Sequence, residues 1–252
     1  MLVLLCGIFC LISHGRYTIA GILLGLTLIK PQLFILVIPV LLLAMSLERR
    51  WPFIASFAIA TTVLMISSWL LDPEWPARWQ GHLAQTARMR LTIAPTIWGF
   101  SHTVVTALRR PDLWAIMSLA ACLILMGIVS YLCYVRRSAL RKGDQLAPLL
   151  SLTMIGSLLV TPYMLSYDFA LLLLPVMTCL SLIQPFPDLM RRALLASLIG
   201  CAIFLPWALL AFSAQTGLET TAALLPASLL VILLIATFTH DRRTASVVLP
   251  RD

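Results

Sequence analysis

Residues 17–47 read YTIAGILLGLTLIKPQLFILVIPVLLLAMSL, an apolar stretch in which Lys30 is the one charged residue. A membrane-spanning helix needs about 20 apolar residues, or about 17–25 with tilt, so one straight helix here would be too long. Pro31 interrupts helical hydrogen bonding, and a break in a membrane persists only where protein or a wet cavity covers it. The stretch therefore predicts two short helices that meet at Lys30-Pro31-Gln32 beside a cavity near one membrane surface.

The apolar character extends over the whole chain. Hydrophobic residues make up 61% and charged residues 11% of 252 residues, with a mean hydropathy of +0.99, whereas soluble domains carry about 25% charged residues. Apolar runs occupy about 2–13, 17–29, 33–47, 53–71, 113–135, 146–160, 169–183, 193–213 and 222–239, and four of them are comfortably long enough to span a bilayer. We expect an all-α polytopic membrane helical bundle with broken short helices, forming a single transmembrane domain over residues 1–252.

The basic residues lie in short clusters between the apolar runs. A net charge of +8 could suit nucleic acid, but clusters in this position mark the cytoplasmic loops of membrane proteins, so we expect no nucleic-acid partner. If residues 48–52 are cytoplasmic, the inside carries Arg16, Arg49, Arg50, Arg136, Arg137, Arg141, Lys142, Arg191, Arg192, Arg242, Arg243 and Arg251. This predicts a multi-pass protein of the cell (inner) membrane with a cytoplasmic C-terminus. Arg109-Arg110 falls outside, either as an exception to the rule or as a functional cationic pair.

The same topology makes residues 72–112 an external loop. Tryptophan favours the interface between lipid and water, and four tryptophans lie in or beside this loop, namely Trp69, Trp75, Trp79 and Trp98. Between residues 77 and 91, apolar residues recur at helical spacing, with basic and polar residues on the other faces. We expect an interfacial helix that lies flat on the outer surface.

The cysteines and histidines show no metal-binding pattern. All six cysteines lie inside apolar runs and none has a Cys-x-x-Cys spacing, which indicates neither a disulfide framework nor a zinc site. His82 and His102 share the external loop, without a further ligand at suitable spacing. We expect no metal ion and no cofactor.

Two segments resemble glycosyltransferase family 87. The first runs from Gly15 to Trp51 and contains the Lys-Pro-Gln break, and the second reads TPYMLSYDFALLLLPV at 161–176. Their order and separation are similar to the second half of this family, whose members are polytopic enzymes of the GT-C superfold. The resemblance implies a membrane glycosyltransferase that moves a hexose, usually mannose, from a polyprenyl-phosphate carrier to a lipid or glycan acceptor on the outer face. The implied partners are this sugar donor, the acceptor and membrane lipids.

The chain opens within an apolar run. Met1 leads directly into Leu2–Leu5, without the cationic region that begins a signal peptide. GT-C enzymes usually carry an essential aspartate in the first external loop, as general base on the acceptor, and this chain resembles the part of the family beyond that point. We therefore expect the carboxyl-terminal part of a longer GT-C-type protein, or a start codon assigned too late, with doubtful activity if the front part is missing.

Sugar transfer from a lipid phosphate requires a cation that holds the leaving phosphate and a carboxylate that takes the acceptor proton. Lys30, beside the helix break, is the leading cation, although a lysine there can also extend to the headgroups without any function. Asp168 is a candidate catalytic carboxylate, or an N-cap of the helix that follows it. Asp72 is another, or a turn residue before Pro73.

Further substrate-binding candidates flank these positions. Tyr163 and Tyr167 could stack on a sugar, or anchor the chain at the interface. Arg88 and Arg90 could grip a phosphate, although a surface helix also carries cations for anionic lipid. His82 could contact substrate, or be solvated.

A second class of function remains open at this point. A transporter or flippase for a lipid-linked or small polar substrate also uses broken helices around a cavity. Transporter halves usually match in hydropathy, and no internal repeat is visible here. The large external loop with its surface helix favours the transferase.

Overall fold

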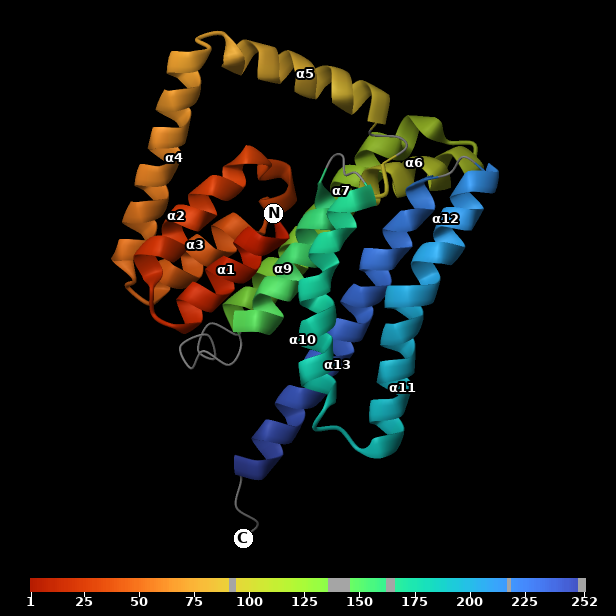
Figure 1. Ribbon diagram of the computed structural model, residues 1–252. Coiled ribbons are helices and arrows are strands. Elements are labelled where there is room, and N and C mark those ends of the chain that lie inside the picture. The colour runs from red at the N-terminus through yellow and green to blue at the C-terminus, as the bar shows by residue number, and fades with distance from the viewer. Residues whose placement is uncertain (91–93, 136–145, 162–165, 217–218, 249–252) are drawn as a thin grey trace.

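The computed structural model describes residues 1–90, 94–135, 146–161, 166–216 and 219–248 (Figure 1). This part of the chain is helical and contains no strand, which confirms the predicted all-α class. The α-helices are α1 (Leu2–Ser13), α2 (Tyr17–Leu26), α3 (Val37–Leu47), α4 (Trp51–Leu71), α5 (Trp75–Arg90), α6 (Ile97–Ala107), α7 (Trp114–Val135), α9 (Leu146–Val160), α10 (Leu173–Ile183), α11 (Asp188–Ile199), α12 (Leu205–Thr216) and α13 (Leu224–Val248). Between them lie the short segments η1 (Thr27–Ile29), η2 (Pro31–Phe34), η3 (Pro111–Leu113), η4 (Ser166–Leu172), η5 (Gly200–Phe204) and η6 (Glu219–Ala223).

The described part of the chain contains both long and short apolar helices. Four are long and apolar enough to cross a membrane, namely Trp51–Leu71, Pro111–Leu132, Asp188–Ser213 and Thr220–Thr239. Five are shorter, namely Leu2–Ser13, Tyr17–Ile29, Val37–Leu47, Leu146–Val160 and Asp168–Ile183. The predicted division into four long and five short runs is confirmed. The third long helix is continuous because the π-helical segment η5 joins α11 to α12 without a turn.

The predicted break at Lys30-Pro31-Gln32 is also confirmed. The α-helix α2 ends at Leu26 and passes through η1 to Lys30, whose φ of −131° and ψ of 67° are not helical. A second 3-10 segment, η2, starts at Pro31, and the chain then returns as α3. The fixed φ of proline suits the first position of a helix but not its interior, so the chain stops one helix and starts another here.

Glycines allow α2 to pack closely against α4. A Cβ atom on Gly21 would lie 2.2 Å from Ser56 Oγ and 2.3 Å from the Phe53 carbonyl oxygen, and one on Gly25 would lie 2.7 Å from Ala60 Cβ. Small residues four apart let two membrane helices approach at their backbones. Because residues 21 and 25 face successive turns of α4, the two helices run in the same direction, and Lys30 lies toward the carboxyl end of α4.

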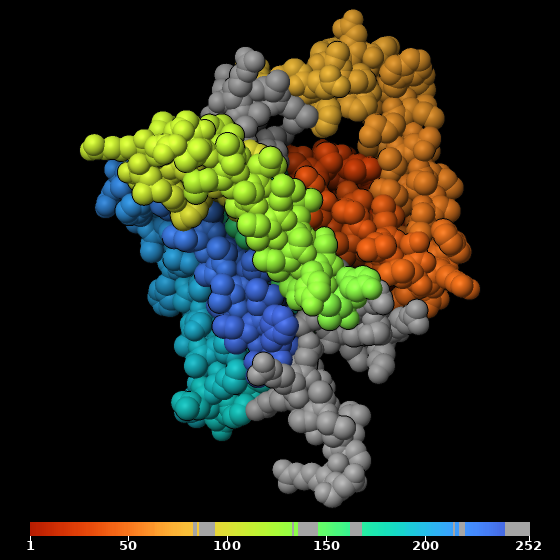
Figure 2. Space-filling view, turned by 180° about the vertical axis from the view of Figure 1, so that it is seen from behind, coloured from red at the N-terminus to blue at the C-terminus, as the bar shows by residue number. Residues whose placement is uncertain are grey.

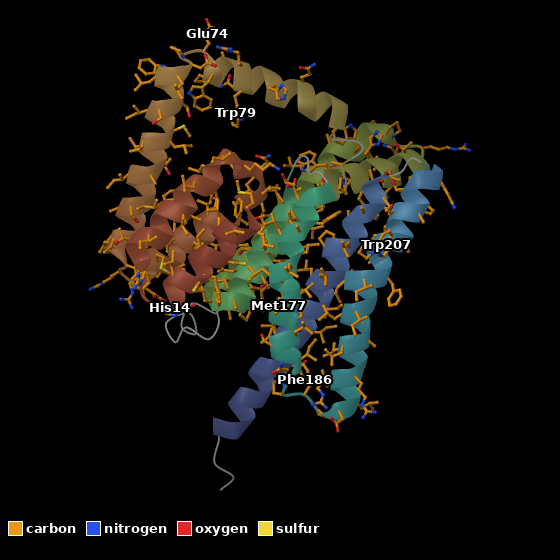
Figure 3. The ribbon with its side chains drawn as sticks, in the orientation of Figure 1. His14, Glu74, Trp79, Met177, Phe186 and Trp207 are labelled. Atoms are coloured by element: carbon orange, nitrogen blue, oxygen red, sulfur yellow. The ribbon has the colours of Figure 1, made fainter. Side chains whose placement is uncertain are left out.

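The turns sort into two ends of the bundle (Figure 1). We call the end that carries α5, α6, the Lys30 turn and η4 the α5 end, and the other the His14 end. In Figure 3, Glu74 and Trp79 lie at the α5 end, whereas His14 and Phe186 lie at the His14 end. The structure therefore places the 14–16, 48–50 and 184–187 turns at the same end of the bundle. This agrees with the predicted topology, in which Arg16, Arg49-Arg50 and Arg191-Arg192 lie on one side of the membrane.

The external loop of the sequence analysis contains two helices rather than one. A helix is present over the predicted segment, namely α5, which runs across the bundle, crosswise to α4 (Figure 1). The second helix, α6, was not predicted, because its sequence, IWGFSHTVVTA, is short and contains glycine and several β-branched residues, which have low helix propensity. It packs beside α7 and near η6, where Thr103 Oγ1 lies 2.9 Å from Thr220 Oγ1.

Helix α9 forms the centre of the bundle. Every residue of α9 except Ala147 is buried, and α3, α7, α10 and α13 all pack against it. Its small polar residues satisfy their hydroxyl groups inside the protein; for example, Ser151 Oγ donates to Thr178 Oγ1 at 2.8 Å. A helix that is apolar all round is expected in such a central position.

Two arginines end their helices in a left-handed conformation. Arg49, after α3, has φ 57° and Arg109, after α6, has φ 59°. In each turn the N–H of the following residue donates to a carbonyl five residues back, at 2.8 Å, as Arg50 to Met45 and Arg110 to Val105. This is the Schellman pattern, in which glycine is the usual left-handed residue. Gly15, with φ 72°, occupies the equivalent position after α1.

Candidate functional site

Lys30 lies at the α5 end in the short gap between η1 and η2. Its backbone N–H donates to the Thr27 carbonyl at 3.0 Å, and its carbonyl accepts from the Leu33 N–H at 3.2 Å. The residue is thus held from both sides, while its side chain remains 30% exposed. A cation in an apolar stretch is costly, by roughly 2.5–3.5 kcal/mol at mid-bilayer, so its position near the end of the bundle fits its charge.

Asp168 pairs with Lys30 across 138 positions of the chain. Lys30 Nζ donates to Asp168 Oδ1 at 3.0 Å, and the Asp168 side chain is only 8% exposed. Asp168 lies in the first turn of the 3-10 segment η4, whereas α10 begins at Leu173. It is therefore not the residue directly before that α-helix, as the N-cap interpretation assumed. The sequence analysis selected both residues but did not predict their contact.

Helix α9 holds the two halves of this pair together. It packs against η2, which follows Lys30, and against η4, which contains Asp168. The Leu36 N–H donates to Ser157 Oγ on α9 at 3.0 Å, and a Cβ atom on Gly156 would lie 2.9 Å from Leu36 Cδ1. A buried hydrogen bond and a close glycine contact fix the depth at which the broken pair α2–α3 docks on α9.

An aromatic cluster lies beside the carboxyl end of α9. Trp98 on α6 donates its Nε1–H to the Val160 carbonyl at 3.0 Å. The Trp98 and Trp114 rings meet edge to face at 6.3 Å between centroids, and His102 meets Trp114 in the same way at 5.9 Å. The sequence analysis identified Trp98 only as an interfacial residue. Its hydrogen bond anchors α6 to the segment that leads toward η4.

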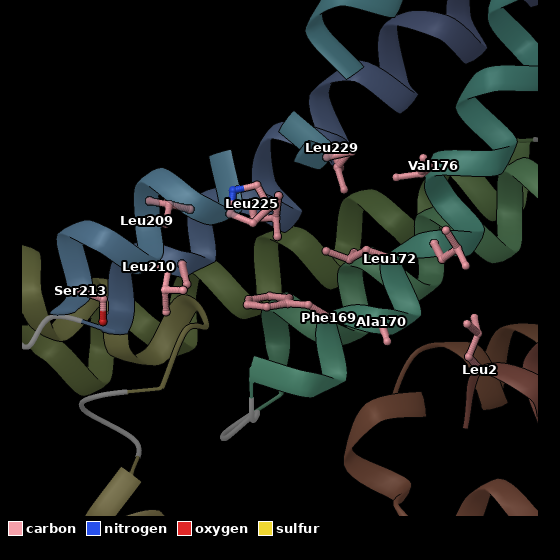
Figure 4. Close-up of a pocket in the computed structure, with 14 residues that line it drawn as sticks. Leu2, Phe169, Ala170, Leu172, Val176, Leu209, Leu210, Ser213, Leu225 and Leu229 are labelled. Atoms are coloured by element: carbon pink, nitrogen blue, oxygen red, sulfur yellow. The ribbon is translucent and has the colours of Figure 1, made fainter. Parts of the chain in front are cut away.

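An apolar groove of about 520 Å³ is lined in part by η4, the segment that also contains Asp168. Phe169, the residue after Asp168, lines its wall on η4, and α10, α12, α13 and Leu2 of α1 form the rest (Figure 4). Among the described residues that line the groove, Ser213 is the one with a polar side chain. The groove extends from the level of Phe169 and Ser213 to that of Val176 and Leu229, so it runs from the α5 end into the depth of the bundle.

The side of the molecule below α5 is open. Figure 2 shows a hollow between α5 and the helices α2 and α3. Trp75 and Trp79 meet edge to face on α5, at 6.3 Å between ring centroids. Helix α5 therefore lies over the end of the bundle, with a hollow between it and the helices below.

The other site predictions have different outcomes. Asp72 ends α4, where it accepts hydrogen bonds from Arg78 and from the Glu74 N–H, which supports the turn interpretation. His82 is exposed on α5. Arg88 and Arg90 on α5 and Tyr167 in η4 have only their backbones described, and Tyr163 lies outside the described residues. The structure thus brings together Lys30 and Asp168 and leaves the substrate roles of the others as predictions.

A metal site does not emerge from the described part of the chain. No group of three or more histidine, cysteine, aspartate or glutamate residues lies close enough there to hold an ion.

Comparison with known proteins gives one match. The family model for glycosyltransferase family 87 matches residues 1–162, which is more than half of the chain. Searches of curated proteins and of solved structures found no significant match. The matched region includes Lys30, Asp72 and the whole of α5, α6 and α9, whereas Asp168 and the groove helices α10, α12 and α13 follow it.

Proposed function

Since this chain belongs to glycosyltransferase family 87, a family of membrane glycosyltransferases, we propose that it transfers a hexose from a polyprenyl-phosphate carrier to a lipid or glycan acceptor. The observation that carries this proposal is the Lys30–Asp168 pair, at 3.0 Å, whose aspartate lies on η4, a segment that also lines an apolar groove. The pair offers a cation for a phosphate and the groove offers an apolar surface for a lipid chain. Mannose is the hexose that the family resemblance suggests.

The proposed reaction forms one bond and breaks one. The acceptor hydroxyl oxygen attacks the anomeric carbon of the sugar, the bond from that carbon to the phosphate oxygen breaks, and the polyprenyl phosphate leaves with the electron pair. The hydroxyl proton passes to a carboxylate base. A fixed cation lowers the barrier because negative charge grows on the phosphate as it leaves, and such preorganised charge is worth about 3–4 kcal/mol.

Lys30 is the residue that we assign to the leaving phosphate. Its side chain is 30% exposed and its backbone is held on both sides. An ammonium group carries three N–H donors, so it can bind a carboxylate and a phosphate oxygen at the same time. The substrate can therefore bind this cation while the backbone hydrogen bonds on both sides of Lys30 stay intact.

The groove suits the isoprenoid chain of such a donor. Pockets that bind small ligands commonly have volumes of about 300–1,000 Å³ and mainly apolar linings, and the groove has about 520 Å³ with one polar residue in its lining. It starts at Phe169, next to Asp168, and runs into the bundle. A donor whose phosphate lies at Lys30 could place its first isoprene units there.

The proposed orientation puts the α5 end outside the cell. The His14 end then carries the cytoplasmic clusters Arg49-Arg50 and Arg191-Arg192, as the positive-inside rule predicts. In this arrangement α5 lies on the outer surface and the C-terminus is cytoplasmic. Sugar transfer takes place on the outer face of the cell membrane.

The test is sugar transfer in washed membranes from cells that produce the protein from its native locus. Radiolabelled polyprenyl-phosphate mannose is the donor, and labelled product is divided by the amount of the protein in the membrane. We expect Lys30→Ala to lower transfer about 100-fold or more, because it removes the phosphate-binding cation. Arg191→Ala, at the His14 end, is the matched control and keeps transfer near the wild-type level. Equal transfer by wild type and Lys30→Ala would remove Lys30 from the site.

The transporter alternative predicts a different result. A flippase moves labelled donor across the membrane of a vesicle without forming a new glycosidic bond. Wild-type vesicles that translocate the donor but form no labelled product, under conditions in which acceptor is present, would contradict the transferase proposal. The family match favours the transferase.

A further inference from the structure

The two members of the ion pair differ in their exposure. The Lys30 side chain is 30% exposed, whereas the Asp168 side chain is 8% exposed. A general base has to come within about 2.6–3.2 Å of the proton that it removes. Of the two side chains, the lysine is thus the one that offers its surface to an incoming substrate.

The burial of Asp168 has an energetic consequence. An ionised carboxylate loses its hydration when it is buried, and only a well-placed cation with good hydrogen bonds offsets that loss. The Lys30 ammonium supplies this charge from a distance of 3.0 Å. In return, the carboxylate holds the end of a long, flexible side chain that would otherwise extend toward water or lipid headgroups.

The position of Asp168 fits this role. Segment η4 packs on α9, which also holds η2, so the carboxylate and the Lys30 backbone share one rigid support. The residue after it, Phe169, lines the groove. The carboxylate that holds the Lys30 ammonium thus lies on η4, the segment that also lines part of the groove proposed for the chain of a lipid-linked donor.

Resting on the proposed function, we infer that Asp168 is a positioning residue that holds the Lys30 ammonium for the donor phosphate, and that it is not the base that takes the acceptor proton. The loss of Asp168 then weakens donor binding, while the chemical step retains its base. This replaces the catalytic role that the sequence analysis considered for Asp168.

The test is the separation of KM from kcat in the same transfer assay. We expect Asp168→Asn to raise KM for polyprenyl-phosphate mannose about tenfold, the equivalent of about 1.4 kcal/mol, and to change kcat by less than about threefold. Polyprenyl phosphate, the released product, should inhibit this variant about tenfold more weakly as well. A kcat about 10²–10⁴-fold lower with an unchanged KM would identify Asp168 as the base and overturn the inference.

A double variant keeps the inference testable if Asp168→Asn does not accumulate. A residue that acts only through Lys30 has no further effect once Lys30 is gone. We therefore expect Lys30→Ala/Asp168→Ala to transfer sugar as slowly as Lys30→Ala, within about twofold. A further loss of about 100-fold in the double variant would show that Asp168 acts independently of Lys30 and would overturn the inference.

The outcomes also separate this inference from the proposed function. Wild-type membranes that transfer no sugar, or transfer that does not depend on Lys30, count against the proposed function itself. Wild-type transfer that depends on Lys30, combined with a kcat effect at Asp168, leaves the function standing and removes only the positioning role. Asp188→Asn is the matched control, because Asp188 pairs with Arg191 at the exposed His14 end.

Discussion

Replacing Lys30 by alanine should destabilise the protein more than replacing Asp168. The substitution leaves the Asp168 carboxylate, 8% exposed, without the cation that lies 3.0 Å from it. Removing one partner of a buried ion pair costs about 3–5 kcal/mol, because the remaining charge stays buried. Since the Lys30 side chain is 30% exposed, water already screens the pair in part, and we expect about 3 kcal/mol.

Replacing Asp168 instead leaves the Lys30 charge, which can move to a more exposed position. Without Asp168, the Lys30 side chain can extend toward water or headgroups, so Asp168→Ala should cost about 1 kcal/mol, as for a partly exposed pair. The double variant Lys30→Ala/Asp168→Ala contains neither charge. We therefore expect its free energy of unfolding to be close to that of Asp168→Ala. The double variant should then lose much less stability than the sum of the two single losses.

Thermal unfolding of the purified protein in detergent measures this difference. For a chain of this size, 1 kcal/mol shifts Tm by about 2–4 °C, so Lys30→Ala should lower Tm by about 6–12 °C and Asp168→Ala by about 2–4 °C. The control Asp188→Ala removes an exposed pair with Arg191 and should change Tm by less than about 2 °C. Equal Tm shifts for the two single variants would refute the reasoning from unequal burial. A Tm shift of the double variant equal to the sum of the two single shifts would refute it as well.

Two further predictions concern the helix packing and the helix ends. Arg109→Gly should raise the free energy of unfolding by about 1 kcal/mol, because Arg109 has φ 59° and glycine adopts that conformation without strain; a lower Tm would contradict this. Gly21→Ala should lower that free energy by about 1–3 kcal/mol, because the new Cβ would meet the Phe53 carbonyl at 2.3 Å. The control is Gly127→Ala, whose new Cβ would have no atom within 4 Å. An equal loss of unfolding free energy in Gly21→Ala and Gly127→Ala would exclude overpacking as the cause.

Sequence reasoning predicts the helices well in this protein because the bilayer imposes simple lengths. Apolar runs of about 20 residues span it and shorter runs do not, and the four long and five short helices follow that division. The break at Pro31 follows from the chemistry of proline. Helix α6 escaped prediction because its sequence is short and rich in β-branched residues of low helix propensity, and the hydrogen bond from Trp98 to Val160 ties it to α9.

The candidate site is only partly predictable from the sequence. Lys30 and Asp168 stand out because charges are rare in apolar surroundings, but their 3.0 Å contact joins residues 138 positions apart. That contact depends on how η2 and η4 dock on the same helix, α9. The groove is likewise invisible in the sequence, because its lining comes from four helices whose residues resemble those of any lipid-facing surface.

By itself, the sequence determined that this protein is a bundle of membrane helices, which of its apolar runs are long and which short, and which charged residues interrupt them. These properties depend on local hydropathy and backbone chemistry, which each segment carries within itself. Only the tertiary structure decided that Lys30 meets Asp168, that the lysine is the more exposed of the two, and that η4 and helices far apart in the chain line a common groove. Pairing and burial depend on which surfaces of different helices face each other, and that is a property of the packed chain.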